Sequence, residues 1–176
     1  MKLVSDIRLL LLGVWLGAAC FFIAVAQTAF AVLPQQRELA GAIVSRTLAI
    51  INYGGLGIGV FLILLSLLAA SNTSRFWLWI ERFLLLILAA ACALGQFVIG
   101  WWMLLLRTQM GKPIDEVAAD DPLRLQFDTL HTYSEWTLLA AMAAALVAFF
   151  IIANRKFGVE KKSTSDPFDF SKEFKP

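Results

Sequence analysis

Four long apolar runs, separated by short polar breaks, account for most of this chain. The runs cover Ile7–Leu33, Leu48–Ala70, Phe76–Leu106 and Leu130–Ala153. A helix needs about 20 apolar residues to cross about 30 Å of hydrocarbon, and each run is longer than that. Lipid offers no hydrogen-bond partners to the backbone, whereas a helix satisfies its backbone hydrogen bonds internally. The pattern therefore predicts an all-α integral membrane protein, folded as a four-helix bundle with short loops.

Composition supports this class and bounds the number of domains. The chain has 176 residues, of which 60% are hydrophobic and 16% are charged, and this excludes an ordinary soluble domain. We expect residues 1–153 to form one transmembrane domain. Residues 154–176 are polar and charged, which predicts a disordered cytoplasmic tail. The net charge of +2 is small and scattered, so we expect no nucleic-acid partner.

The basic residues predict the orientation in the membrane. An even number of spans places both termini on one side. Eight basic residues near the span ends lie on that side, namely Lys2, Arg8, Arg75, Arg82, Arg155, Lys156, Lys161 and Lys162. Five lie on the other side, namely Arg37, Arg46, Arg107, Lys112 and Arg124. Cytoplasmic loops carry the excess of Lys and Arg, so both termini are predicted to be cytoplasmic.

Two local patterns refine the helices. Asp121 followed by Pro122 is typical of an N-cap with proline in the first helical turn, so the fourth helix is predicted to begin before its apolar run. Glycine pairs four residues apart, such as Gly55 and Gly59, allow close approach of helices in lipid, where no hydrophobic effect drives association. We expect these pairs to mark packing faces.

Polar side chains gather in the predicted outer half of the bundle. Counting 1.5 Å per residue from the span ends, all four helices contribute polar groups to that half. The inner half is predicted to be nearly all aliphatic and aromatic. A one-sided polar layer favours a cleft open to the outer face. The predicted ligand-binding residues are Gln27, Arg46, Asn52, Gln96, Arg107 and Ser134.

The fourth helix carries the most distinctive group of residues. Asp128, His131 and Glu135 are spaced i, i+3 and i+7, so they share one stripe of the helix. Imidazole and carboxylate groups together form sites for divalent metals. A hydrogen-bonded network that ties helices together explains the same residues, and so does a proton-handling histidine oriented by a carboxylate. The predicted metal ligands are these three residues, and the three explanations stay open here.

Two classes of function remain. The first is a non-enzymatic membrane protein that binds a small ligand or a metal ion in the polar outer half. The second is an accessory or structural subunit of a larger membrane complex. Membrane-protein partners or a homodimer are the expected protein contacts, because the small-residue faces allow helices to associate. No nucleophile–base constellation, phosphate-binding loop or H-E-x-x-H motif is present in the sequence, and we expect no enzymatic activity. The sequence predicts no particular cofactor, and its expected surroundings are the lipid bilayer.

Several short motifs resemble one known family. They are Gly13-x-Trp15-x-Gly17, the Leu33-Pro34 exit, Ala40-Gly41-x-Ile43-Val44 leading to Asn52-Tyr53, and Phe127-x-x-Leu130-His131-x-x-Ser134. These elements, spread over residues 5–153, resemble the bacterial four-helix membrane family of unknown function of the DUF4149 type. That family is similar to transmembrane-protein-205-like proteins and, distantly, to copper-resistance D-type proteins. The resemblance implies a multi-pass protein of the bacterial inner membrane and raises the expectation of metal or small-cation handling.

Overall fold

The computed structural model describes residues 2–68 and 75–161, which are helical nearly throughout. The elements are α1 (Lys2–Val32), α2 (Arg37–Leu68), α3 (Arg75–Ala93), the π-helix η1 (Leu94–Ile99), α4 (Gly100–Met110), the short 3₁₀ helix η2 (Ile114–Glu116) and α5 (Pro122–Lys161). The third span is continuous through α3, η1 and α4. Within these described residues, four helices are long and apolar enough to cross a membrane. The predicted all-α, four-helix class is confirmed, while the orientation of the termini stays a prediction.

The helices extend beyond the apolar runs. α2 begins at Arg37, well before the run that starts at Leu48, and α5 continues to Lys161, past the domain boundary predicted after Ala153. Hydropathy marks only the part of a helix that suits lipid, whereas the backbone hydrogen bonds of a helix continue into its polar flanks. The remainder of the predicted tail, residues 162–176, lies outside the described residues.

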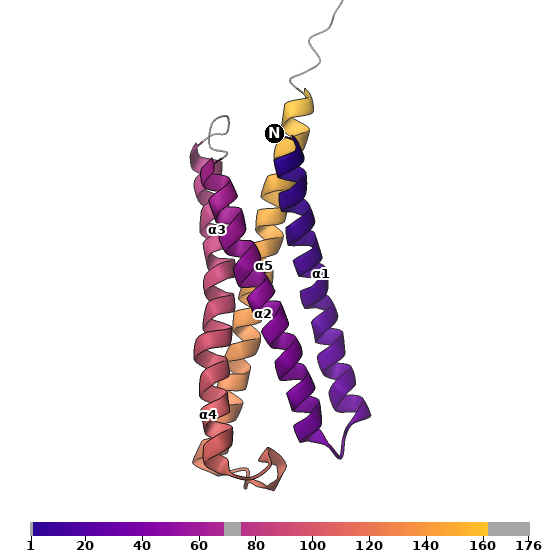
Figure 1. Ribbon diagram of the computed structural model, residues 1–176, viewed down its shortest axis with the longest axis vertical. Helices are drawn as coiled ribbons and strands as arrows, with labels where there is room; N and C mark the ends of the chain where they lie inside the picture. Colours follow the sequence, from indigo (N-terminus) through magenta and orange to yellow (C-terminus); the bar gives the residue numbers. More distant parts are fainter. Residues whose placement is uncertain (1, 69–74, 162–176) are drawn as a thin grey trace, which may run out of the picture.

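The helices form a four-membered bundle in which α1 and α3 lie diagonally opposite each other. α2 packs between α1 and α3, and α5 packs on the other side between α3 and α1. Figure 1 shows the start of α1, the end of α2, the start of α3 and the end of α5 at one extremity, which we call the termini end. The opposite extremity, with the α1–α2 turn and residues 111–121, is the loop end.

Close packing in the middle of the bundle depends on a glycine of α2. A Cβ atom added at Gly55 would lie 2.5 Å from Cys92 Sγ and 2.7 Å from Trp15 Nε1. The Trp15 indole donates a hydrogen bond of 3.0 Å to the Ile51 carbonyl. The absent side chain therefore lets α1, α2 and α3 meet, as predicted for this glycine pair. Gly17 of α1, in contrast, has no neighbour within 4 Å of a built Cβ.

A buried ion pair crosses the bundle near the termini end. Arg8 Nη1 of α1 donates to Glu81 Oε1 of α3 at 3.1 Å, and the two residues are 6% and 0% exposed. The prediction of a nearly all-aliphatic and aromatic inner half is therefore wrong. The sequence places Arg8 near the end of its span, but its long side chain reaches the interior because a carboxylate compensates its charge there.

A second arginine fixes the end of α2 beside this ion pair. Arg82 of α3 donates from Nε to Ser66 Oγ at 3.0 Å and from Nη2 to the Ser66 carbonyl at 2.9 Å. Ser66 is fully buried and lies in the last turn of α2, where carbonyls lack helical partners. Because a guanidinium supplies donors to these carbonyls and complements the helix dipole, Arg82 caps α2 from the neighbouring helix.

Candidate functional site at the loop end

Two short segments form the loop end, and each belongs to one pair of helices. In the first, the Gln36 amide donates to the Leu33 carbonyl at 3.1 Å, and this closes a tight turn between α1 and α2. In the second, α4 stops at Gly111, whose φ of 61° lies in the left-handed region. Glycine enters that region without the Cβ clash that other residues meet, so it ends the helix and redirects the chain.

Residues 111–121 are tied to α5. The Asp121 carboxylate accepts a hydrogen bond of 2.8 Å from the Leu123 amide, which confirms the predicted N-cap of the fourth span. One turn later, Arg124 Nη1 donates to the Val117 carbonyl. The segment therefore lies with α4 and α5, whereas the opposite turn lies with α1 and α2.

A groove of about 590 Å³ separates the two segments. Its volume falls in the range of small-molecule sites, which is roughly 300–1,000 Å³. We call it the loop-end groove, and it is lined by Gln35, Gln36, Arg37, Glu38, Leu39 and Ala42 from the turn and α2, and by Pro113, Asp115 and Glu116 from the opposite segment. Leu39, Ala42 and Pro113 give it an apolar part, so the groove offers both carboxylates and an apolar surface.

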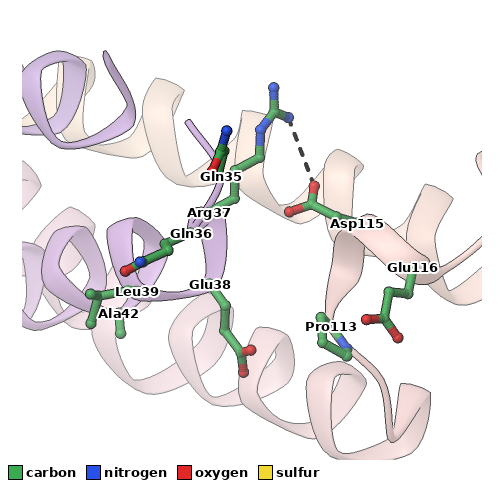
Figure 2. A pocket seen from close by; sticks show the side chains of 9 residues that line it. All are labelled: Gln35, Gln36, Arg37, Glu38, Leu39, Ala42, Pro113, Asp115 and Glu116. Atoms are coloured by element: carbon green, nitrogen blue, oxygen red, sulfur yellow. Dashed lines mark ion pairs between the residues drawn. The ribbon is translucent and has the colours of Figure 1, made fainter. Parts of the chain in front are cut away.

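The charges of the loop-end groove are unbalanced. Arg37 Nη1 lies 3.8 Å from Asp115 Oδ1, and both side chains are largely exposed. Figure 2 shows this ion pair spanning the groove, with the side chains of Glu38 and Glu116 on either side of Pro113. Within the described residues, neither of these two carboxylates has an ion-pair partner. The groove therefore carries a net negative charge, which favours a cation.

The two pairs of helices also separate along α1 and α5 toward the loop end. Near the termini end these helices meet, because a Cβ at Gly13 of α1 would lie 3.7 Å from the Phe149 ring of α5. His131 stands 18 residues before Phe149, or five helical turns, on the same face of α5. Its side chain is nevertheless 50% exposed. Gln27, which lies on the side of α1 that carries Gly13, is also exposed. The faces that pack at Gly13 are thus apart at the level of Gln27.

The structure joins two of the three predicted metal ligands. His131 Nε2 lies 3.4 Å from Glu135 Oε1, one turn away on α5, and Asp128 is exposed. In residues 2–68 and 75–161, no group of three or more His, Cys, Asp or Glu side chains is placed to hold a metal ion. A stripe along one helix places carboxylates and imidazole side by side, but convergence on one point needs a ligand from another element. The described part of the chain does not supply one.

Two of the predicted ligand-binding residues lie inside the bundle at the π-helix. Asn52 of α2 is 5% exposed, and its Nδ2 would lie 3.2 Å from a Cβ at Gly95 of η1. Gln96, the next residue of η1, is half-buried. Wider π-helical turns are rare and frequently occur at functional sites. The two amides therefore meet an irregular segment of the third span, which the apolar pattern of the sequence does not reveal.

The remaining predicted residues are distributed around the loop half. Arg107 of α4 lies against α2, since a Cβ at Gly41 would be 3.3 Å from its Nη2. Its guanidinium carbon also lies 5.1 Å from the centre of the Phe127 ring, a cation–π distance. Arg46 is exposed on α2 and Ser134 is half-buried on α5. Arg107 thus connects the two pairs of helices, whereas the structure does not bring Arg46 and Ser134 to it.

Sequence reasoning missed the residues of the loop-end groove. The acidic character of residues 107–128 is visible in the sequence, and so is Glu38 in the first turn of α2. Pro113 within an acidic loop is the sequence signal that could have indicated these residues, because proline restricts the local backbone and so favours an ordered loop. The sequence pattern does not predict how the two pairs of helices are arranged at the loop end, and this arrangement places Glu38 and Glu116 on opposite walls of the groove.

Comparison with known proteins agrees with the resemblance seen in the motifs. The model of the family described as "Domain of unknown function (DUF4149)" matches residues 10–112. No curated protein and no solved structure matches the chain, so the likeness to transmembrane-protein-205-like and copper-resistance D-type proteins stays a prediction. The family match covers more than half of the chain, from α1 to the end of α4. This multi-pass membrane protein therefore belongs to the DUF4149 family.

Proposed function

We propose that this protein is a non-enzymatic protein of the bacterial inner membrane that binds a small, positively charged ligand at the loop end of its bundle. The observation that carries the proposal is the loop-end groove, which Glu38 and Glu116 line from opposite walls, each without an ion-pair partner in the described residues. Leu39, Ala42 and Pro113 would contact an apolar part of the ligand. A small organic cation meets both requirements.

The polar residues predicted from the sequence belong to the same half of the bundle. His131 and Glu135 flank the separation of α1 and α5, with Gln27 on the facing helix. In the proposal they are a second contact region for a ligand that extends from the groove. A bare metal ion is less well supported, since the described part of the chain holds no three-residue cluster for one.

A calorimetric titration of the gently extracted protein tests the groove. Benzyltrimethylammonium is a cation with an apolar ring, and phenylacetate carries the same ring with a negative charge. We expect the cation to bind and the anion not to bind. The variant Glu38→Gln/Glu116→Gln should bind the cation about tenfold more weakly, which corresponds to about 1.4 kcal/mol. Asp120→Asn is the matched control, because Asp120 is an exposed carboxylate of the same segment outside the groove.

Further titrations separate the groove from the sites predicted by sequence. Equal binding of phenylacetate, or unchanged binding in the double groove variant, would exclude the loop-end groove. If His131→Ala and Glu135→Ala abolish binding while the groove variant does not, the site lies between α1 and α5. A zinc titration of the same variants examines the predicted metal set, with loss of zinc binding in His131→Ala as its expected signature.

The second candidate function is an accessory or structural subunit of a larger membrane complex. The observation that favours it is exposure of polar side chains on membrane-spanning helices, namely Gln27 on α1 and Arg46 on α2. Lipid satisfies such groups poorly, whereas a neighbouring protein helix can do so. Blue-native electrophoresis after mild extraction distinguishes the two. A stoichiometric complex with other subunits would support this function, and a lone monomer or homodimer would count against it.

A further inference from the structure

The two halves of the bundle are held together very differently. From the termini end to the middle, α1, α2 and α3 are joined by the buried Arg8–Glu81 pair, by the cap of Arg82 on Ser66 and by the Trp15 hydrogen bond. Every one of these contacts includes a buried partner. In a low-dielectric interior such contacts are strong and costly to break. Strong buried contacts therefore hold α1, α2 and α3 together in this half.

The polar contacts between the two pairs of helices in the loop half involve exposed side chains, beside buried apolar residues such as Val44 of α2 and Leu106 of α4. Arg37 and Asp115 are 3.8 Å apart, with side-chain exposures of 62% and 45%. Arg107 reaches Gly41 from α4, and it is an exposed residue. An exposed ion pair contributes at most about 1 kcal/mol to stability. The polar contacts between the α1–α2 pair and the α4–α5 pair at the loop end are therefore weaker than those of the termini half.

The π-helix η1 lies at the border between these halves. It follows Cys92, which packs against the Gly55 contact, and it precedes α4, which carries Arg107. Asn52 faces Gly95 of η1 with only 5% of its surface exposed. Its side chain has no hydrogen-bond partner in the described part of the chain. The irregular turn of η1 therefore lies at the level where the two halves of the bundle meet, and such turns often occur at functional sites.

We propose that the protein is a clamp whose two arms open and close at the loop end. One arm is the loop half of α1 and α2, and the other is α4, residues 111–121 and the start of α5. The π-helix η1 is the hinge, and the Arg37–Asp115 ion pair is the latch across the loop-end groove. Opening and closing of the clamp would regulate access to the proposed ligand site. The hinge motion itself does not depend on the proposed function, and only the expected effect of a ligand rests on it.

Distances between spin labels in the ligand-free protein test the hinge. Cys20, which is exposed, is replaced by serine, while buried Cys92 stays unlabelled. Labels at Gln27→Cys and Thr132→Cys report on the loop half of α1 and α5. Labels at Leu10→Cys and Phe150→Cys report on the same helices near the termini end, and all four positions are exposed. We expect a distance distribution at least about twice as wide for the loop pair.

Two variants identify the hinge and the latch. Asp115→Arg places two arginines together and should move the loop-pair distribution to longer distances, whereas Asp120→Arg on the same segment should not. Deletion of Phe97 removes one residue of η1, which shortens the π-helix to an ordinary helical turn. It should narrow the loop-pair distribution to a single peak. The termini pair should stay unchanged in both variants, and this shows that the bundle is intact.

The outcomes separate this inference from the proposed function. Equally narrow distributions for both label pairs overturn the clamp, and so does an Asp115→Arg distribution that matches Asp120→Arg. If deletion of Phe97 prevents folding, the Asp115→Arg comparison decides alone. Benzyltrimethylammonium should shift the loop pair toward shorter distances. If benzyltrimethylammonium causes no shift but the ligand-free distribution is wide, the proposed cation binding is refuted and the proposed hinge is supported.

Discussion

The termini end and the loop end of this bundle use ion pairs in opposite ways. At the termini end, Arg8 and Glu81 are buried in the bundle interior at 3.1 Å. At the loop end, Arg37 and Asp115 are exposed and 3.8 Å apart. Burial makes each charge of the first pair dependent on its partner, whereas solvent screens the second pair. The comparison teaches that one end is a fixed joint and the other is a contact that can be released.

The largest effect is expected from breaking the buried pair on one side only. Glu81→Leu removes the buried carboxylate that lies 3.1 Å from Arg8 Nη1 and should lower the free energy of unfolding by about 3–5 kcal/mol. The measurement is denaturant unfolding of the protein in mild detergent. In the double variant Arg8→Met/Glu81→Leu both charges are gone, so most of the loss should be recovered. A double variant as unstable as Glu81→Leu would mean that packing, not charge, joins α1 to α3 here.

Overpacking in the middle of the bundle should have the next largest effect. The Cβ of Gly55→Ala would overlap Cys92 Sγ and Trp15 Nε1, and forced repacking of a core costs about 1–3 kcal/mol. Thermal unfolding followed by tryptophan fluorescence measures this, since Trp15 is at the contact. Gly57→Ala on the same helix is the control, because nothing lies within 4 Å of its Cβ. Equal melting temperatures for the two variants would contradict the close approach described for Gly55.

Removing the cap of α2 should weaken the fixed end more moderately. Arg82→Met loses two hydrogen bonds to Ser66, and hydrogen bonds of charged groups contribute about 1.5 kcal/mol or more each. Because Arg82 is only half-buried and water replaces part of the loss, we expect about 1.5 kcal/mol in total by the same unfolding assay. Ser66→Ala keeps the backbone carbonyl as acceptor and should cost less. A larger loss for Ser66→Ala would show that the hydroxyl matters more than the cap.

The smallest effect is expected at the latch. Asp115→Asn removes an exposed ion pair, so global stability should fall by no more than about 0.5 kcal/mol. Its effect should instead appear in the loop-half label distances, and added salt should reproduce it in the unchanged protein by screening. Salt-independent distances in the unchanged protein would show that Arg37 and Asp115 do not hold the arms together.

Hydropathy predicted the fold because every segment that spans lipid has to be apolar and has to satisfy its own backbone hydrogen bonds. The four spans, the all-α class and the Asp121 cap followed from local patterns, and Gly55 behaved as a close-packing glycine. Helix ends were less predictable, since α2 begins at Arg37 in a polar stretch that hydropathy ignores. Such local rules work where a structural feature depends on residues that are close to it in the sequence.

The polar contacts were harder to predict because they depend on how the helices are arranged. Depth counting placed Gln27 and His131 in one half of the bundle, but it did not reveal that the faces carrying them separate. The sequence places Arg8 near the end of its span, and only the diagonal placement of α1 and α3 makes Glu81 its partner. Glu38 and Glu116 line one groove because segments far apart in the sequence meet at the loop end, and the spacing of residues in the sequence does not predict that arrangement.

The Arg8–Glu81 contact also has a consequence for how the protein is made. The partners are 73 residues apart in the chain. At a synthesis rate of roughly 5–20 residues per second, the carboxylate emerges from the ribosome roughly 4–15 s after the arginine. Until then, the arginine of the first span has to stay near the lipid headgroups, where its long side chain can reach water. The first span therefore reaches its final position in the membrane only after the third span has been inserted. Membrane insertion of this chain is thus sequential, and the Arg8–Glu81 contact forms late.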